Sequence, residues 1–405
     1  MKPSGADLSL VKQLNSALIL NLLLSESSQS RASLAQQTGL NRSTISSLVA
    51  DLIAAGLVRE IGLEEDSSRG RPGVLLELNP YGGGVIGLEI NIGYITAILT
   101  DFTAQILWRK QVSFAHDADQ LSIIRLGEEL IYATLQASQA HNLKPLGLGL
   151  AVPGLVDRSE GVLVYAPNLH WRNVPFRDLW GTKFDIPFYI ENDGNAAALG
   201  ERYFGVAKGY HDFLFLGTGV GMSGGLMLNN QLYRGIGGFA GEVGHIIVES
   251  GGELCGCGRR GCWETLVGTP AVVRGVVKAL NAGAPSRIPD LVNHNLDLIT
   301  MEVVVEAAAQ GDQLALNTLS EIALHLGSGI TNLINIFNPE LIVLGGELIL
   351  AGHYLLPTIG KIIAAEALND LSRMVALAVS SQTTDACVRG AATLVIDGIV
   401  RKPIF

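Results

Sequence analysis

Three cysteines and a histidine lie close together in the sequence and form a candidate metal site. Cys255, Cys257 and Cys262 fall within eight residues, and His245 comes ten residues before the first of them. One imidazole and three thiolates make a closed tetrahedral ligand set, which suits structural Zn²⁺ and leaves no position for a reacting water. The glycines between the cysteines allow tight turns. The sequence therefore predicts a structural zinc site, with buried free thiols or a redox pair as the alternatives.

Carboxylates and an amide accompany this cluster. Asn192 and Asp193 come directly after a predicted strand, at the carboxyl end where α/β proteins bind ligands. Glu242 and Glu264 lie on either side of the metal cluster in the sequence. Carboxylates, an amide and an imidazole suit a polyhydroxyl ligand, because each carboxylate accepts hydrogen bonds from two adjacent hydroxyls. The alternative is that Glu242 and Glu264 are solvated surface acids.

The first 80 residues are predicted to fold as a separate DNA-binding domain. Helical spacing predicts helices over 8–24, 31–38 and 42–55, and two strand-like runs follow at 57–61 and 74–78. This order is that of a winged helix-turn-helix. In the first helix the expected core face consists of Val11, Leu14, Leu18 and Leu22.

Short polar side chains at the start of the third helix are the expected DNA readers, because a recognition helix contacts base edges near its N-terminus. Arg31 on the second helix would contact the phosphate backbone, and Arg69 and Arg71 at the hairpin tip would reach a minor groove. A protein-interaction domain is the alternative. A domain of this size makes few contacts, which favours a dimer on two half-sites. The expected readers are Asn41, Arg42, Ser43, Thr44, Ser46 and Ser47.

Composition limits the class of protein. The 405 residues include 28 basic and 38 acidic side chains, a formal net charge of −10, which argues against a nucleic-acid coat protein. The first 79 residues hold seven basic and eight acidic side chains, so they carry only −1 of that charge. No uninterrupted apolar run reaches the ~18 residues of a membrane span, and no secretory signal is evident. A cytoplasmic protein without a membrane partner is expected.

From residue 85 onward strands alternate with helices, which predicts an α/β domain with partly parallel sheets. Its length favours two lobes. A glycine-rich turn from Leu216 to Gly225 offers backbone N–H groups that could hold a phosphate, although glycine-rich hairpins are common. The expected strands are 85–90, 96–100, 147–151, 188–190, 213–216, 225–228 and 341–344, and the long helices are 121–138, 271–280 and 321–337.

Taken together, these motifs resemble the ROK family of repressors, open reading frames and sugar kinases, over essentially the whole chain. The most specific pieces are GEVGH with CGCGRRGCWE, ENDGNAAALGE, and LGTGVG with LYRGIGGFAGE. The helix-turn-helix with RGRP marks the repressor branch, and LVKQLNSALILNLL resembles xylose-repressor-type members. The resemblance implies a two-lobed actin-like, ribonuclease H-like domain over 81–405. Lobe one would comprise about 81–190 plus about 391–405, and lobe two about 191–390.

The resemblance also implies roles for individual residues. Asp193 matches the general base of the family kinases, and Asn192, Glu242, His245 and Glu264 match the sugar contacts, with Asn168 as a further contact. His245 would then serve both metal and sugar through its two ring nitrogens. The first phosphate loop departs from the kinase pattern: GLEINIGYIT places side chains of Glu89, Asn91, Ile92 and Tyr94 where glycines let ATP approach. Asp193 is therefore expected to be a vestigial base.

These observations predict a sugar-responsive transcriptional repressor of carbohydrate genes and no enzyme. A sugar, with xylose favoured by the N-terminal segments alone, would bind between the lobes and change the affinity of a homodimer or tetramer for operator DNA. One alternative is an ATP-dependent sugar kinase with a fused DNA-binding head. Another is a domain that senses a phosphotransferase protein rather than a sugar.

Overall fold

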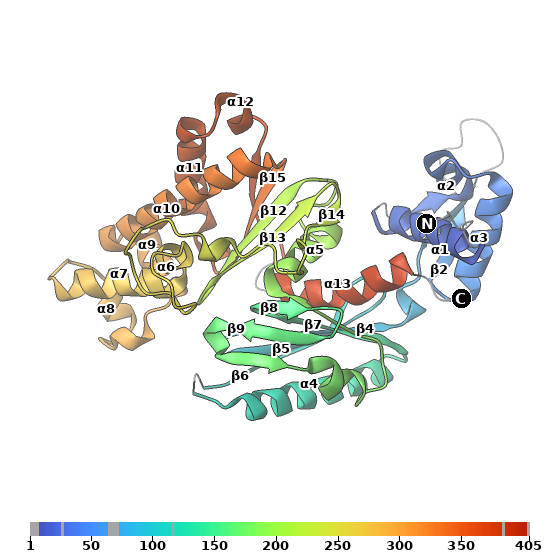
Figure 1. Ribbon diagram of the computed structural model, residues 1–405, viewed down its shortest axis with the longest axis horizontal. Helices are drawn as coiled ribbons and strands as arrows, with labels where there is room; N and C mark the ends of the chain where they lie inside the picture. Colours follow the sequence, from blue (N-terminus) through green and yellow to red (C-terminus); the bar gives the residue numbers. More distant parts are fainter. Residues whose placement is uncertain (1–7, 26–27, 64–72, 116, 383–384, 403–405) are drawn as a thin grey trace. The chain divides into compact units, whose positions relative to one another are not determined.

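The chain divides into two compact units in this computed structural model, which describes residues 8–25, 28–63, 73–115, 117–382 and 385–402 (Figure 1). The first unit comprises Met1–Ala151, Pro175–Glu191 and Ala391–Phe405, and the second comprises Val152–Val174 and Asn192–Gly390. The expected lobes differ from this division at 152–174. That segment belongs to the second unit, and its strands form a sheet of their own.

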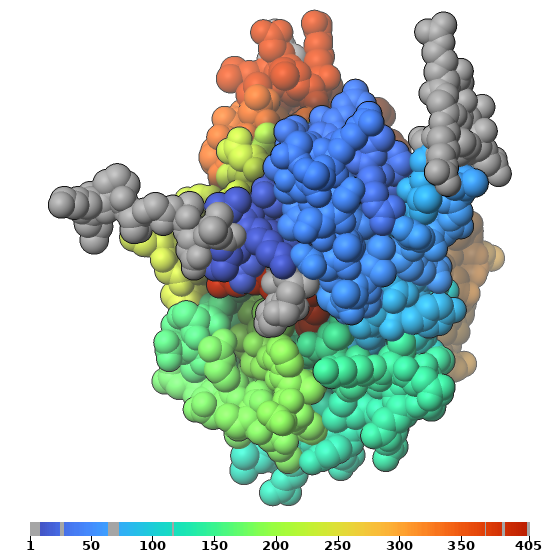
Figure 2. All heavy atoms as spheres, turned by 90° about the vertical axis from the view of Figure 1, so that its right-hand side faces the viewer, coloured from blue at the N-terminus to red at the C-terminus, as the bar shows by residue number. Residues whose placement is uncertain are grey.

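A helical module with a small sheet begins the first unit, and its residues form one continuous blue surface in Figure 2. Ser30 Oγ accepts the N–H of Ser33 and so caps α2, while Asn41 Oδ1 accepts the N–H of Thr44 and caps α3. The strands pair antiparallel in the order β1-β3-β2. The predicted winged helix-turn-helix is therefore confirmed. Its elements are α1 (Leu8–Ser25), β1 (Gln29–Ser30), α2 (Arg31–Thr38), α3 (Arg42–Ala54), β2 (Val58–Leu63) and β3 (Val74–Leu78).

The predicted core face of α1 is wrong. Leu14 and Leu18 are 56% and 49% exposed, whereas Ile19, Leu20 and Leu23 are buried. The C-terminal half of α1 is apolar around most of its circumference, so helical spacing alone does not select the face that packs against α3 and β3.

A five-stranded sheet forms the rest of the first unit, in the order β11-β7-β4-β5-β6. β4 pairs antiparallel with β5 and parallel with β7, and β5 pairs antiparallel with β6. Helix α4 (Gln120–Ala140) packs against β4 and β5 through buried residues such as Ile123 and Ile131. The strands are β4 (Gly84–Ile90), β5 (Tyr94–Thr100), β6 (Ile106–Ser113), β7 (Pro145–Val152) and β11 (Phe188–Asn192).

A second five-stranded sheet, in the order β14-β13-β12-β15-β16, carries the core of the second unit. β12 (Phe213–Thr218) pairs antiparallel with β13 (Met222–Leu228) and parallel with β15 (Leu341–Gly346). The other two strands of this sheet are β14 (Gln231–Leu232) and β16 (Ala376–Val379). A separate three-stranded sheet consists of β8 (Leu155–Asp157), β9 (Val162–Ala166) and β10 (Trp171–Val174). The helices are α5 (Asp193–Phe204), α6 (Glu264–Val267), α7 (Thr269–Asn281), α8 (Ile288–Leu291), α9 (Met301–Ala309), α10 (Gln313–Phe337), α11 (Leu348–Glu366) and α12 (Asn369–Ser372). Helix α13 (Ala386–Arg401) contributes residues to both units.

Within the described residues, α11 alone is long and apolar enough to cross a membrane by length and composition, a test that core helices of folded domains also pass. It packs against α10, β15 and β16 through Leu355, Ile359 and other buried residues. These contacts are those of a core helix in the second unit.

Candidate functional site

The predicted metal ligands come together in the second unit. The ligand atoms of His245, Cys255, Cys257 and Cys262 all lie within 4.8 Å of one another. Cys257 Sγ is 3.7 Å from Cys262 Sγ, and Cys255 Sγ is 3.6 Å from His245 Nδ1. A tetrahedron with Zn–S and Zn–N bonds of about 2.3 and 2.0 Å has edges of about 3.5–3.8 Å. These two separations match such edges, so the four residues could hold a metal ion once the other separations, which reach up to 4.8 Å, shorten to the same length.

A tight loop brings the cysteines together. The N–H of Cys255 donates to the carbonyl of Arg259, and the N–H of Gly258 donates to the carbonyl of Cys255. Gly258 has a φ of 88°, a conformation that favours glycine. The predicted glycine turns are thus present. The guanidinium of Arg259 also hydrogen-bonds to Cys257 Sγ, which places a positive charge beside that sulfur.

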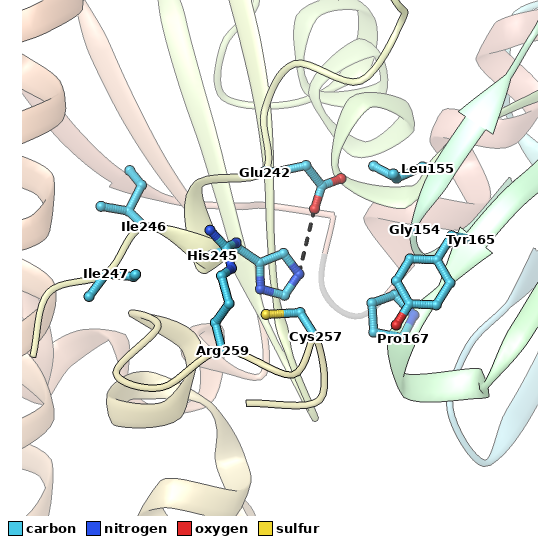
Figure 3. Close-up of a pocket in the computed structure, with 10 residues that line it drawn as sticks. All are labelled: Gly154, Leu155, Tyr165, Pro167, Glu242, His245, Ile246, Ile247, Cys257 and Arg259. Atoms are coloured by element: carbon cyan, nitrogen blue, oxygen red, sulfur yellow. Dashed lines mark ion pairs between the residues drawn. The ribbon is translucent and has the colours of Figure 1, made fainter. Parts of the chain in front are cut away.

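The two ring nitrogens of His245 face different neighbours. Nδ1 faces Cys255 Sγ and lies 3.5 Å from Glu264 Oε1, while Nε2 lies 3.8 Å from Glu242 Oε2 (Figure 3). One nitrogen is therefore available to the metal cluster and the other to a ligand beside Glu242. Any ion bound at Nδ1 leaves the proton of a neutral ring on Nε2, so that Nε2 acts as a donor.

Asp193 begins α5 at the carboxyl end of β11, as the sequence predicted. Gly194 lets α5 approach β13 closely, because a Cβ there would lie 2.7 Å from the carbonyl oxygen of Gly224. The Asp193 carboxylate hydrogen-bonds to Ser223 and to backbone N–H groups at the start of α5. Desolvation outweighs these hydrogen bonds and raises the pKa of Asp193 to about 6.

Asn192 ties this helix start to the backbone just before β8. Its Nδ2 donates to the Gly154 carbonyl at 3.0 Å, and its Oδ1 accepts the N–H of Asn195 at 3.2 Å as the N-cap of α5. Both ends of the amide are thus engaged within the protein, so Asn192 fixes the backbone around Asp193.

The carboxylate of Glu242 has a more strongly raised pKa than that of Asp193. Burial, followed by the negative charges of Asp193 and Glu264, raises its pKa to about 7. Its side chain is still 35% exposed, and it lines a cavity of about 640 Å³ together with His245. A hydroxyl-rich ligand in this cavity would find a hydrogen-bond acceptor that has few protein partners to compete for it.

Glu264 and Asn168 lie against the loop that carries the cysteines. Glu264 is 9% exposed and accepts hydrogen bonds from Cys255 Sγ at 2.8 Å and from the N–H of Met222 at 3.3 Å. The Asn168 amide lies against Gly221 and Gly256, where an added Cβ would be 2.9 and 2.6 Å from its terminal atoms. The structure thus brings all the predicted polar residues of the second unit into one region, with Glu264 on the side of the metal cluster.

A carboxylate that the sequence analysis missed lies beside the glycine-rich turn. Glu347 follows β15, and its N–H donates to the carbonyl of Thr218. Its side chain accepts a hydrogen bond from Thr269 Oγ1 and lies 3.6 Å from the position of a Cβ on Gly219. Burial raises the pKa of Glu347. A carboxylate directly after a Gly-Gly pair at a strand end was the signal that could have revealed it.

Side chains also fill the turn between β4 and β5 in the first unit. Asn91 Nδ2 donates to Glu89 Oε1 and to the hydroxyl oxygen of Tyr94, both at 2.8 Å, and the Tyr94 hydroxyl lies 3.3 Å from Glu89 Oε1. Glu89 is 2% exposed. Ile92 joins this turn through its N–H, which donates to Asn91 Oδ1.

The start of α3 presents most of the predicted DNA readers to solvent. Asn41 is engaged as the N-cap, Thr44 is half-buried, and Ser46 Oγ donates to the carbonyl of Arg42. Arg31 makes an ion pair with Glu60 at 2.8 Å, which offsets part of its charge. Arg69 and Arg71 lie outside the described residues. The exposed readers are Asn41, Arg42, Ser43, Ser46 and Ser47.

A polar hollow of about 630 Å³ adjoins the beginning of α3. Ser33 and Gln36 of α2 line it together with Asn41 and Arg42. Both residues belong to the segment Ser30 to Gln37, which the sequence predicts to pack across the third helix and contact the DNA backbone.

Comparison with known proteins agrees with this architecture. The chain matches the winged helix-turn-helix DNA-binding family at residues 17–59 and the ROK family at residues 85–398. It is 32% identical to a xylose repressor of Caldicellulosiruptor bescii over 98% of both chains.

Two solved structures extend the comparison. One is a ROK family transcriptional regulator, homologous to the Mlc protein of Escherichia coli, with a TM-score of 0.82 and 28% identity over 96% of this chain and 98% of that one. The other is a ROK family glucokinase from Streptomyces griseus in complex with glucose and AMPPNP, with a TM-score of 0.70 and 31% identity over 77% and 99%. The matched segments account for both modules, and the chain belongs to the ROK family.

Proposed function

We propose that this chain is a sugar-responsive, DNA-binding transcriptional repressor of carbohydrate genes. The observation that carries the proposal is the presence, in one chain, of an α3 with an exposed polar start and of neighbouring Asp193, Glu242 and His245 side chains, whose chemistry suits hydroxyl groups. The 32% identity to a xylose repressor over 98% of both chains supports xylose as the first sugar to test.

Zinc is the proposed metal, because three thiolates and one imidazole in a closed set are typical of structural zinc. The ion would cross-link the loop that carries Cys255, Cys257 and Cys262 to the turn that carries His245. This chain's residues then do the binding: the fixed Nε2–H of His245 donates to a sugar hydroxyl, and Glu242 accepts from a neighbouring one.

Asp193 would accept a further hydroxyl of the ring, and Asn168 and Glu264 would support the floor of the site. In this arrangement Asp193 orients a hydroxyl but has no phosphoryl donor to react with. Asn192 contributes by holding Gly154 and the start of α5 in place.

Two groups of side chains oppose nucleotide binding. The Glu89–Asn91–Tyr94 cluster occupies the turn that, by resemblance to family kinases, would approach ATP phosphates. Glu347 places a second carboxylate beside the glycine-rich turn at Gly219. Negative carboxylates repel phosphate groups that no bound cation screens. We therefore propose that the chain is no enzyme.

Sugar binding would change the population of chain conformations and so the spacing of the DNA-reading helices in a dimer or tetramer. The coupling is reciprocal, so operator DNA must weaken sugar binding by the same factor by which sugar weakens operator binding. A repressor of this kind acts in the cytoplasm, where the operator DNA is.

The experiment measures binding of fluorescent duplex DNA, selected by the purified chain from a random pool, by anisotropy. Xylose, glucose and N-acetylglucosamine are added in turn, and ADP release is followed in parallel with ATP and the same sugars. We expect one sugar to weaken DNA binding and none to release ADP. Brisk ADP release would favour the alternative of a sugar kinase with a DNA-binding head. The similarity to the glucokinase supports testing that alternative.

A further inference from the structure

The cavity beside Glu242 and His245 is larger than one sugar ring requires. It measures about 640 Å³ and belongs entirely to the second unit. Figure 3 shows Leu155 and Tyr165 on one side of it and Ile246 and Ile247 on the other, with the two polar side chains between them. Pockets of ~300–1,000 Å³ hold drug-sized ligands, and a single ring of about ten heavy atoms is small for that class.

Two further polar residues adjoin the Gly154 side of the cavity without lining it. Asn192 joins the Gly154 carbonyl to the start of α5, and Asp193 is close enough to Glu242 for their charges to interact. A first sugar ring, held as the proposed function requires, therefore lies between Glu242, His245 and this side of the cavity. That placement leaves the opposite side without a partner from the first ring.

The opposite side of the cavity combines two apolar side chains with the hydrogen-bond donors of a guanidinium group. Ile246 and Ile247 are 43% and 53% exposed although they line the cavity. Arg259 lines the same end, and its guanidinium is directed by a hydrogen bond to Cys257 Sγ. One sulfur cannot accept all five guanidinium N–H groups, so donors remain for a ligand. A second sugar ring matches this pair, because it has an apolar C–H face and a rim of hydroxyl acceptors.

We propose that the site takes a two-ring glycoside, with one ring held at Glu242 and His245 and the glycosidically linked second ring packed on Ile246 and Ile247 under the Arg259 guanidinium. The inference rests on the proposed function, because the first ring must bind at Glu242. It adds a specificity determinant: disaccharide is preferred to monosaccharide.

Titration calorimetry of the full-length, metal-loaded chain with matched pairs tests this inference. The probes are xylose against xylobiose and glucose against cellobiose. In at least one pair we expect the disaccharide to bind about tenfold more tightly, which is about 1.4 kcal/mol. Equal affinities within every pair that binds would overturn the inference and leave the sugar-responsive function standing. Absence of binding by all four sugars would overturn both.

Two variants locate the second ring. Ile247→Thr should remove most of the disaccharide advantage while leaving the monosaccharide affinity unchanged. Val248→Thr is the matched control, because Val248 is 41% exposed on the same segment but does not line the cavity, and it should keep the full advantage. Arg259→Ala gives an independent reading, with metal content measured alongside. An advantage that survives both Ile247→Thr and Arg259→Ala would overturn the assignment.

Discussion

Replacement of Asp193 by asparagine tests the electrostatics of the site through the pH dependence of stability. The pKa of Asp193 rises from 3.8 to about 6 on folding because burial disfavours the charged form. Below pH 3.8 the folded and unfolded chains both hold this proton. Between pH 3.8 and 6 the folded chain keeps it and the unfolded chain loses it, so raising the pH destabilises the fold. Asparagine removes this dependence.

The magnitude follows from the shift. About two pKa units at about 1.4 kcal/mol each amount to about 3 kcal/mol of stability in total, most of which the wild type loses between pH 4 and 7. For a unit of this size, each kcal/mol moves the melting temperature by about 2–4 °C, so the upper limit is roughly 6–12 °C. The hydrogen bonds that asparagine cannot accept subtract about 1 kcal/mol at every pH and leave the slope unchanged.

The assay is differential scanning fluorimetry of wild type and Asp193→Asn at constant metal content from pH 4 to 7. We expect the melting temperature of the variant to rise relative to wild type as the pH increases. Asp312→Asn is the control in the same unit. Desolvation opposes the shift, but hydrogen bonds from the N–H groups of Ala315 and Arg287 lower the Asp312 pKa.

The Asp312 carboxylate therefore stabilises the fold above pH 3.8, and this contribution disappears only as the pH falls through its lowered folded value. The Asp312→Asn difference should stay flat from pH 5 to 7. Parallel curves for wild type and Asp193→Asn over the whole range would refute the raised pKa of Asp193.

Three further predictions concern the metal loop and the DNA-reading helix. Cys257→Ser should lose the metal, measured by elemental analysis, and with it the sugar response; a zinc-free variant with full response would separate the two. Gly256→Ala places a Cβ 2.6 Å from Asn168 Oδ1 and should weaken sugar binding a few-fold in calorimetry. Gly258→Ala is the control, because its Cβ meets no atom within 4 Å. The positive φ at Gly258 should cost about 1 kcal/mol of folding stability and leave the sugar affinity unchanged. Arg42→Ala should weaken DNA binding and lower the slope of log K against log salt by about one, and an unchanged slope would show that Arg42 contacts no phosphate.

Elements with a clear periodic pattern could be predicted from the sequence. Helix α3 begins at Arg42 after its Asn41 cap, as predicted, because the cap residue and the apolar spacing agree. Strand β6 was missed because Arg109 and Lys110 lie on this edge strand, where charged residues prevent edge-to-edge pairing and hide the apolar pattern. The exposed face of α1 could not be predicted, since its sequence is apolar on several sides.

The residue types of the candidate site could be predicted from the sequence, whereas the contacts between its side chains could not. The ligand set from His245 to Cys262 came from spacing alone, because chemistry limits what three thiolates and an imidazole do together. That His245 divides its nitrogens between Cys255 and Glu242 depends on the turn geometry of the fold. Glu347 reaches Gly219 only because β12 and β15 pair parallel, a contact between residues more than a hundred positions apart.

The separation of Glu89 and Glu347 affects how such a chain can evolve. Each carboxylate lies at the end of a different sheet, with its own hydrogen-bonded neighbours, Asn91 in one case and Thr269 in the other. If both carboxylates exclude nucleotide, as proposed above, relieving one leaves the other in place, so a lone substitution is expected to give no phosphoryl transfer on which selection could act. A change toward such chemistry would then need substitutions at both positions.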